Sequence, residues 1–266
     1  MHVRVTHRLI AYLFGTLALA VGLSVAAPAL SEPGDAVRFP EADWDPILIE
    51  KSRRNVVVTG DRSPGIAPPP RNMSAQTAWE IRRLLYLQRT ARGPDAVIEI
   101  MQENFLDLED LLVRRKVMPP RGDAPDLWDL YDLGHADVVT LVLREKHRFQ
   151  RARPTQLSDE LHAIIPIPGH AAYPSGHATE MNFTARFLSR LAPACAADYR
   201  DIATRVARNR EIAGVHYPSD SRAGARIAGW YAGLYAASRV WSRRSDAAAS
   251  QLAAFVEAQG CPEPGL

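Results

Sequence analysis

The sequence is poor in cysteine and has no excess of charge of either sign. Its 266 residues include only two cysteines, and two cysteines alone imply no metal site. The first 29 residues hold two arginines and no acidic residue. Of the 32 Lys and Arg residues, 30 therefore lie after residue 29, and they equal the 30 Asp and Glu residues in number. A chain without net charge gives no reason to expect nucleic acid as a partner.

Long apolar runs are absent after residue 30, where stretches such as residues 138–143 are too short to cross a membrane. The first 29 residues differ, because a basic start precedes an apolar run at residues 9–25 and the small residues Ala27-Pro28-Ala29. This order is typical of a signal peptide, which we expect at residues 1–29. The protein is then periplasmic or secreted, with no stable membrane insertion after signal removal. An uncleaved membrane anchor is the alternative.

The two cysteines, Cys195 and Cys261, fit an oxidising compartment, in which a pair of thiols tends to form a disulfide. A bridge between them would close a loop in the C-terminal part of the chain and contribute up to about 4 kcal/mol. Two free thiols are the alternative, because a sequence does not show whether the two Cα atoms approach each other.

The spacing of apolar residues predicts an all-α protein with one folded domain. Ser74 is suited to cap a first helix and Pro94 to open a second. Similar helical periodicity runs through residues 127–149, 176–191, 199–215 and 219–241. No sustained alternation of the kind that strands show is present. Residues 30–73 are rich in Pro and Gly and predict an irregular lead-in rather than packed structure, so the folded domain is expected at residues 74–266.

Three clusters of chemically active residue types lie in the C-terminal half. In order they are Lys146-x6-Arg153-Pro154, Pro174-Ser175-Gly176-His177 and Arg210-x5-His216-x3-Asp220. Each cluster alone is a weak signal, since lone basic residues and histidines are usually solvated or structural. All three in this order and at these spacings are far less prone to arise by chance.

The clusters contain what a metal-free phosphoryl transfer needs. The transferred group spreads negative charge over three oxygens, which cations and N–H donors must surround. Lys146, Arg153 and Arg210 supply the cations. Ser175 and Gly176 precede a predicted helix, so their backbone amides are expected to face an anion at the helix N-terminus. These five residues therefore predict a phosphate-binding site.

The two histidines of the clusters divide the remaining chemistry. Asp220 can accept a hydrogen bond from Nδ1 of His216, which fixes the tautomer and leaves Nε2 free to attack phosphorus. His216 is therefore the predicted nucleophile. His177, attached to the oxyanion-binding turn, is placed to protonate the leaving oxygen and later to accept a proton from water.

The three clusters resemble the signature of the type 2 phosphatidic acid phosphatase (PAP2) superfamily, and the exported form resembles the bacterial class A acid phosphatases most. The signature reads Lys-x6-Arg-Pro, Pro-Ser-Gly-His and Ser-Arg-x5-His-x3-Asp, and Asn209 stands where its second Ser is usual. Both side chains donate and accept hydrogen bonds, so we expect tuning rather than loss of activity. The resemblance implies a single-domain helical bundle, a phosphohistidine intermediate, inhibition by vanadate and no cofactor.

The leading hypothesis is an exported, metal-independent acid phosphatase that hydrolyses small phosphate monoesters. A vanadium-dependent haloperoxidase would use nearly the same residues to hold vanadate, and a lipid or polyprenyl phosphatase would act on a different leaving group. A periplasmic module that binds phosphate esters without cleaving them is the non-enzymatic alternative. Self-association into a homo-oligomer remains open.

Overall fold

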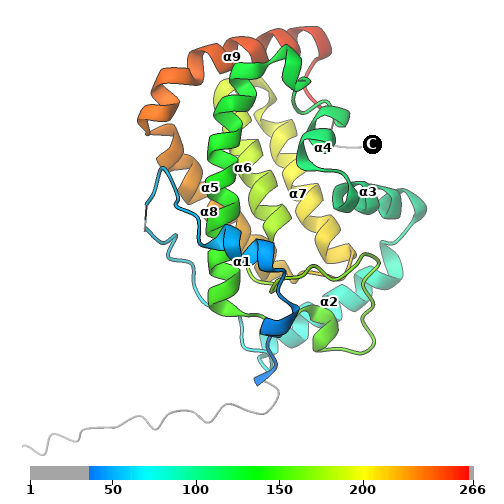
Figure 1. Cartoon of the computed structure of the whole chain (residues 1–266). Helices are drawn as coiled ribbons and strands as arrows, with labels where there is room; N and C mark the ends of the chain where they lie inside the picture. Colours follow the sequence, from blue (N-terminus) through cyan, green and yellow to red (C-terminus); the bar gives the residue numbers. More distant parts are fainter. Residues whose placement is uncertain (1–35, 61, 264–266) are drawn as a thin grey trace, which may run out of the picture. The chain divides into compact units, whose positions relative to one another are not determined.

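The computed structural model describes residues 36–60 and 62–263, and the predicted signal peptide lies outside this part of the chain. Within it the secondary structure is helical, apart from an isolated antiparallel bridge between Arg38 and Arg151. The predicted all-α fold class is confirmed. The α-helices (Figure 1) are α1 (Pro46–Ser52), α2 (Ala75–Thr90), α3 (Pro94–Phe105), α4 (Leu108–Arg114), α5 (Pro125–Phe149), α6 (Gly176–Leu191), α7 (Ala196–Ile212), α8 (Pro218–Ala236) and α9 (Arg239–Gln259).

Several helix boundaries follow from local sequence signals. Ser74 caps α2, where its Oγ accepts a hydrogen bond from the backbone amide of Thr77 at 3.2 Å, and α3 begins at Pro94. The helix expected at residues 219–241 is wrong as a single element. It ends at Ala236, and Ser238 caps the new helix α9 by accepting from the amide of Trp241 at 3.2 Å. None of the helices in the described residues combines the length and apolar character that a membrane crossing requires.

Helix α6 is the central element of the core. It packs most extensively on α7 and α8 and also on α5. Figure 1 shows it between α5 and α7. Its Phe183 is fully buried between Tyr131 of α5 and Tyr231 of α8, with ring centroids 6.0 and 5.6 Å away. Burial of a side chain of this size stabilises the fold by about 1.5–3 kcal/mol. The helices that carry the predicted site residues therefore share one hydrophobic core.

The start of α6 lies unusually close to α8 at Gly224. A Cβ atom at this position would come within 2.7 Å of Thr179 Oγ1 and 2.9 Å of the Ser175 carbonyl oxygen. Neither distance is compatible with a side chain at residue 224. Gly224 thus sets the distance between the N-terminal turn of α6 and α8, both of which carry predicted site residues.

The Pro- and Gly-rich residues before α2 are packed against the helices, which corrects the irregular lead-in expected there. Helix α1 packs against α5 (Figure 1). Asp137 of α5 is buried, and its carboxylate accepts hydrogen bonds from the backbone amides of Val57 and Val58 at 2.8 and 2.9 Å and from the hydroxyl of Tyr231 at 2.8 Å. Pro and Gly disfavour regular secondary structure, but they do not prevent tertiary contacts of this kind.

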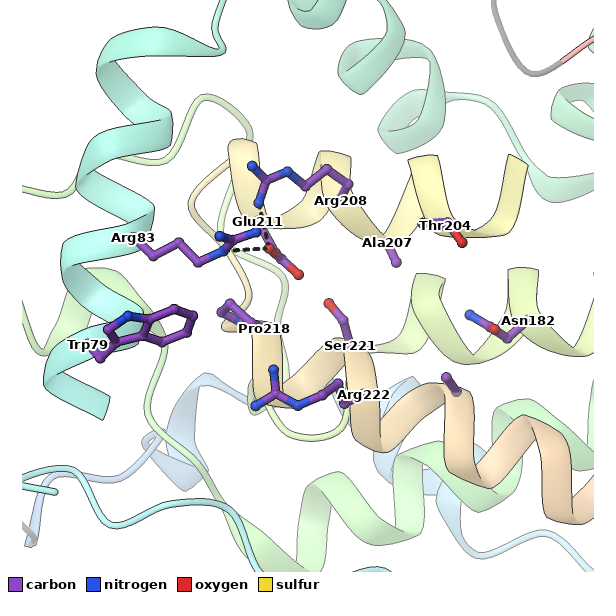
Figure 2. A pocket seen from close by; sticks show the side chains of 11 residues that line it. Trp79, Arg83, Asn182, Thr204, Ala207, Arg208, Glu211, Pro218, Ser221 and Arg222 are labelled. Carbon is purple, nitrogen blue, oxygen red and sulfur yellow. Dashed lines mark hydrogen bonds and ion pairs between the residues drawn. The ribbon is translucent and has the colours of Figure 1, made fainter. Parts of the chain in front are cut away.

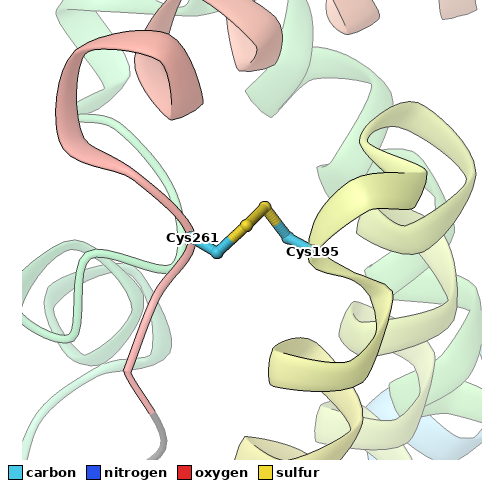
Figure 3. The surroundings of a disulfide bond; sticks show 2 residues. All are labelled: Cys195 and Cys261. Carbon is cyan, nitrogen blue, oxygen red and sulfur yellow. A yellow bond between two sulfur atoms is a disulfide. The ribbon is translucent and has the colours of Figure 1, made fainter.

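The structure contains a disulfide between Cys195 and Cys261, with the two Cα atoms 5.3 Å apart (Figure 3). It joins the segment that follows α9 to the turn that precedes α7. A sequence separation of 66 residues gives about 4 kcal/mol of stabilisation in the chain-entropy model.

Candidate active site

The three sequence clusters come together where α5 and α7 end and where α6 and α8 begin. Arg153 Nη1 lies 3.2 Å from His216 Nε2, which joins the first cluster to the third. The amide of Ser175 donates to the carbonyl of Asp220 at 3.1 Å, which joins the second to the third. Lys146 lies beside the start of α6, since its Cε would be 3.9 Å from a Cβ at residue 176. The predicted site residues therefore surround one location.

The hydrogen bonds of His216 define its tautomer. A guanidinium group can only donate, so Nε2 of His216 accepts the hydrogen bond from Arg153 and carries the lone pair. Nδ1 then carries the proton and donates to Asp220 Oδ2 at 3.0 Å. Burial, with the charges of Arg153 and Lys146, lowers the pKa of His216 well below its usual value. The structure thus presents a neutral imidazole with an unprotonated Nε2, as a nucleophile requires.

Asp220 is itself held by residues that the sequence clusters do not include. Arg151 Nη1 donates to Asp220 Oδ1 at 2.5 Å, and Nη2 of the same guanidinium donates to Glu80 of α2 at 3.3 Å. Arg151 also lies over the ring of Tyr217 at 3.8 Å from its centroid. Glu80 accepts from the amide and hydroxyl of Ser219 at 2.8 and 2.7 Å. Nothing in the local sequence marks Arg151 or Glu80 as members of the site.

All three predicted cations are buried, and two of them, Lys146 and Arg153, donate chiefly to backbone carbonyls. Lys146 Nζ donates to Ala171 and Ala172 at 2.8 and 3.2 Å. Burial, then the charge of Arg153, lowers the pKa of Lys146. Arg153 donates to the carbonyls of His170 and Val215 at 2.7 and 2.8 Å, and burial lowers its pKa to about 10. Arg153 therefore stays charged in neutral and acidic solution.

Arg210, the third cation, has guanidinium N–H groups that are not hydrogen-bonded within the described residues. Its Nη2 donates to Glu103 Oε2 at 2.6 Å and to the carbonyl of Ile100 at 3.2 Å. Its Nε and Nη1 are buried and have no hydrogen-bond partner among the residues that the structure describes. A buried donor without an acceptor costs about 1–3 kcal/mol. An oxyanion beside Arg210 would supply the missing acceptors.

The N-terminal turn of α6 differs in one respect from the sequence-based expectation. The amide of Ser175 is bonded to the Asp220 carbonyl, and the Ser175 hydroxyl accepts from the amide of Ala178 at 3.4 Å as the helix cap. Ser175 therefore has no free amide for an anion, which corrects the role expected for it. Gly176 and His177 occupy the first two helical positions, where amides have no acceptor within the helix.

The hydrogen bond of His177 involves the ring nitrogen Nε2. Its Nε2 lies 3.0 Å from the backbone carbonyl of Glu103, and since a carbonyl only accepts, Nε2 carries a proton. Nδ1 is then the nitrogen that can gain or lose a proton. Burial, together with the charge of Arg210, lowers the pKa of His177 to about 4, although Glu180 acts in the opposite direction.

Asn209, which stands where the family signature usually has Ser, is hydrogen-bonded to Glu103. The Asn209 side chain donates to Glu103 Oε1 at 2.8 Å, and Arg115 donates to the same oxygen at 3.0 Å. Burial raises the pKa of Glu103, and the charge of Arg210 partly opposes this. Asn209 therefore acts on Glu103 rather than directly on a phosphate. Glu103 was missed in the sequence because it precedes the first cluster by more than forty residues.

Two cavities lie close to these residues. The smaller, about 240 Å³, is lined by Glu103, Asn104, Leu106, Leu108, Leu111, His177, Glu180 and Met181. The larger, about 490 Å³, lies among α2, α6, α7 and α8 (Figure 2). In it Arg83 and Arg208 bind Glu211, and Trp79 and Arg222 form part of its wall. None of the predicted site residues lines the larger cavity, so its size does not identify it as the catalytic site.

Comparisons with known proteins agree with this geometry. The sequence profile of the PAP2 superfamily matches residues 130–245, a region that contains all three clusters. Lipid A 1-phosphatase of Rhizobium etli (strain ATCC 51251 / DSM 11541 / JCM 21823 / NBRC 15573 / CFN 42) is 34% identical over 95 residues, which cover 34% of this chain and 41% of that protein. The match thus spans about two fifths of the relative's length.

A solved structure also shares the fold. It is described as the first bacterial vanadium-dependent iodoperoxidase and superposes with a TM-score of 0.59 at 16% sequence identity, covering 78% of this chain and 62% of the other. Identity this low shows a common fold and nothing more. Residues 130–245, which carry the three clusters, are therefore similar in sequence to the PAP2 superfamily.

Proposed function

We propose that the protein is an exported, metal-independent phosphatase that hydrolyses phosphate monoesters through a phosphohistidine on His216. The observation that carries the proposal is Arg210, a cation that acts electrostatically on His216. Its buried Nε and Nη1 have no hydrogen-bond partner in the described part of the chain. Phosphate oxygens would accept from these donors, from Lys146 and from Arg153. Together the three cations offset the charge that a metal ion offsets in other phosphatases.

The reaction has two steps. In the first, Nε2 of His216 attacks phosphorus, and Arg153 exchanges its bond to Nε2 for one to a phosphate oxygen. The P–O bond of the ester breaks, and the leaving oxygen takes the proton from Nδ1 of His177. In the second, His177 accepts a proton from water, the hydroxide oxygen attacks phosphorus, and the P–N bond to His216 breaks. Asp220 holds the imidazole throughout.

An acidic working range follows from His177. Its pKa of about 4 means that the free protein carries the donor proton in acid and loses it as the pH rises. For an alkyl phosphate, whose leaving oxygen needs this proton, kcat/KM is expected to fall as the pH rises above about 4.

A lipid phosphatase is the second candidate, and the identity with lipid A 1-phosphatase favours it. The chemistry at phosphorus would be the same, and only the leaving group would differ. The discriminating assay compares a soluble monoester with a phosphorylated lipid dispersed in detergent. A kcat/KM at least tenfold higher for the lipid would select this candidate.

The same donors fit vanadate as well as phosphate, because both are oxyanions with several acceptor oxygens. Lys146, Arg153 and Arg210 would hold its oxygens, and His216 would bind the metal. Bound vanadate would supply Lewis-acid activation of peroxide. Incubation with vanadate, bromide and peroxide tests this alternative, since halogenation in the absence of phosphatase activity would select it.

The central experiment compares His216→Ala with His177→Ala in excess EDTA. Loss of the nucleophile should abolish turnover of aryl and alkyl phosphates alike. Loss of the acid should slow alkyl phosphates by about 10²–10⁴-fold and slow an activated aryl phosphate less. The His177 variant should also accumulate ³²P-labelled protein that is acid-labile and base-stable.

Four results would contradict the proposal. They are a strict requirement for added Zn²⁺ or Mg²⁺, label trapped on the His216 variant, equal loss on both substrates for the His177 variant, and no inhibition by millimolar orthovanadate. Binding of phosphate esters without turnover would select the non-enzymatic alternative.

A further inference from the structure

The cavity beside His177 has features that select a leaving group. We propose that it holds the alcohol portion of the substrate and that Glu180 makes it favour uncharged, hydroxyl-bearing alcohols such as polyols and sugars over alcohols that carry a negative charge. This inference rests on the proposed phosphatase function and adds the class of substrate to it.

Position is the first argument. In the proposed mechanism His177 gives its proton to the leaving oxygen, so the leaving group lies next to this ring. His177 lines the cavity of about 240 Å³, whereas the larger cavity of Figure 2 contains neither catalytic histidine. At roughly 30 Å³ per water molecule, this volume is on the order of eight waters, enough for a polyol or one sugar ring.

The apolar wall of the cavity comes from two elements. Leu106, Leu108 and Leu111 belong to the turn after α3 and to α4, and Met181 belongs to α6. Such side chains pack against the C–H groups of a carbon skeleton. They offer no partner to a second charged group, which would lose its water without compensation.

The polar wall contains two carboxylates, Glu103 and Glu180, which differ in the partners that offset their negative charge. Glu103 is paired with Arg210 and Arg115, so its charge is offset. Glu180 is hydrogen-bonded through Oε2 to His135 at 2.9 Å, and its Oε1 would lie 3.4 Å from a Cβ at residue 176. Glu180 therefore stands one helical turn after His177, between the cavity and the start of α6.

The charge of Glu180 decides how it acts on a ligand. Burial alone would raise the pKa of Glu180, but the bond to His135 and the charges of His135, His177 and Lys146 outweigh it and lower the pKa to about 2. The carboxylate is thus ionised above that pH. It accepts a hydrogen bond from a substrate hydroxyl, and it repels a leaving group that carries its own carboxylate.

Two nearly isosteric substrates test the proposal. Glycerol 3-phosphate and 3-phosphoglycerate differ in one end of the leaving group, a CH₂OH in the first and a carboxylate in the second. The measured quantity is the ratio of their kcat/KM values in each variant, so that any general loss of activity cancels. We expect the wild-type protein to favour glycerol 3-phosphate by about 10- to 100-fold, chiefly through KM.

Two variants change the charge of the cavity in opposite directions. Glu180→Gln should bring the ratio to within about threefold of unity. Asn104→Asp, which adds a carboxylate to the same wall, should raise the ratio above that of the wild type. Glu257→Gln removes the same charge from an exposed position on α9 and should leave the wild-type ratio unchanged. If Glu180→Gln does not fold, Asn104→Asp still tests the charge effect.

The outcomes separate this inference from the proposed function. Suppose that the wild type hydrolyses an aryl phosphate. If it then shows no preference between the two substrates, or if neither Glu180→Gln nor Asn104→Asp alters the ratio, the role of the cavity is overturned and the phosphatase function stands. Failure of the wild type to hydrolyse any of the three esters would overturn both.

Discussion

Substitution of Asp220 by Asn tests the tautomer of His216 with almost no change in shape. Every neighbour of the Asp220 carboxylate is a hydrogen-bond donor. Oδ1 accepts from Arg151 at 2.5 Å, and Oδ2 accepts from Nδ1 of His216 and from the amide of Tyr217, both at 3.0 Å. An Asn side chain has one acceptor oxygen and one NH₂ group, so its NH₂ must face a donor in either orientation.

The two orientations have unequal consequences. An NH₂ group facing Arg151 meets a guanidinium that keeps its protons, and this contact cannot be relieved. An NH₂ group facing His216 can be accommodated if the imidazole moves its proton to Nε2. The protonated Nε2 then faces Arg153 as a second donor and cannot attack phosphorus. Either arrangement weakens the nucleophile.

The expected magnitude follows from the same change in other enzymes that orient a histidine with a carboxylate. There the wrong tautomer costs about 10⁴-fold in kcat. We expect a loss of about 10³–10⁴-fold for Asp220→Asn, which is about 4–5.5 kcal/mol at 1.36 kcal/mol per tenfold. The loss should be similar for aryl and alkyl phosphates, because both need the same attack by Nε2 of His216 and none of the contacts of Asp220 involves the leaving group.

The assay is single-turnover formation of ³²P-labelled protein from an aryl phosphate. Ser219→Ala is the matched control, because the Ser219 hydroxyl contacts Arg151 and Glu80 without touching His216. It should retain activity within about tenfold. Urea denaturation confirms that each variant is folded. A folded Asp220→Asn protein that forms the labelled intermediate within tenfold of the wild-type rate would refute the role assigned to Asp220.

Three further predictions concern stability. Burial lowers the pKa values of His177 and His216 in the folded protein, so between about pH 4 and 6.5 the unfolded chain binds more protons and the free energy of unfolding should rise with pH, by up to about 1.36 kcal/mol per pH unit for each histidine. Urea titrations at pH 4.5, 5.5 and 6.5 measure this, and a stability that falls over the range would contradict it. Replacing Cys195 and Cys261 together by Ser should lower the unfolding free energy by up to about 4 kcal/mol and leave kcat unchanged. Two titratable thiols in the denatured, unreduced wild-type protein would exclude the disulfide. Asn209→Ser removes a hydrogen bond to the buried carboxylate of Glu103. The free energy of unfolding measured in urea should fall by about 1.5–3 kcal/mol, and kcat should stay within tenfold of the wild type. An unchanged stability would argue against the contact with Glu103.

The sequence alone determined the helical class, the starts of α2 and α3 and the extent of α6, because caps, prolines and helical periodicity are local signals. It also indicated the three clusters and the Cys195–Cys261 pair. Local periodicity shows which face of a helix is buried, but it does not show which element covers that face. For this reason the packing of the segment before α2 was predicted wrongly. The division between α8 and α9 was also predicted wrongly, although the cap at Ser238 is a local signal.

Only the tertiary structure decided how the site is supported. Glu80 reaches Ser219 across 139 residues, and Glu103 reaches Asn209 across 106. On a chain with 30 acidic residues, a glutamate at helical spacing looks like a solvated surface residue. The hydrogen bond from the Ser175 amide to the backbone carbonyl of Asp220 likewise depends on the close approach of α6 and α8. Motif spacing records the residue types that chemistry needs, whereas the partners that orient them are chosen by packing between segments far apart in the chain.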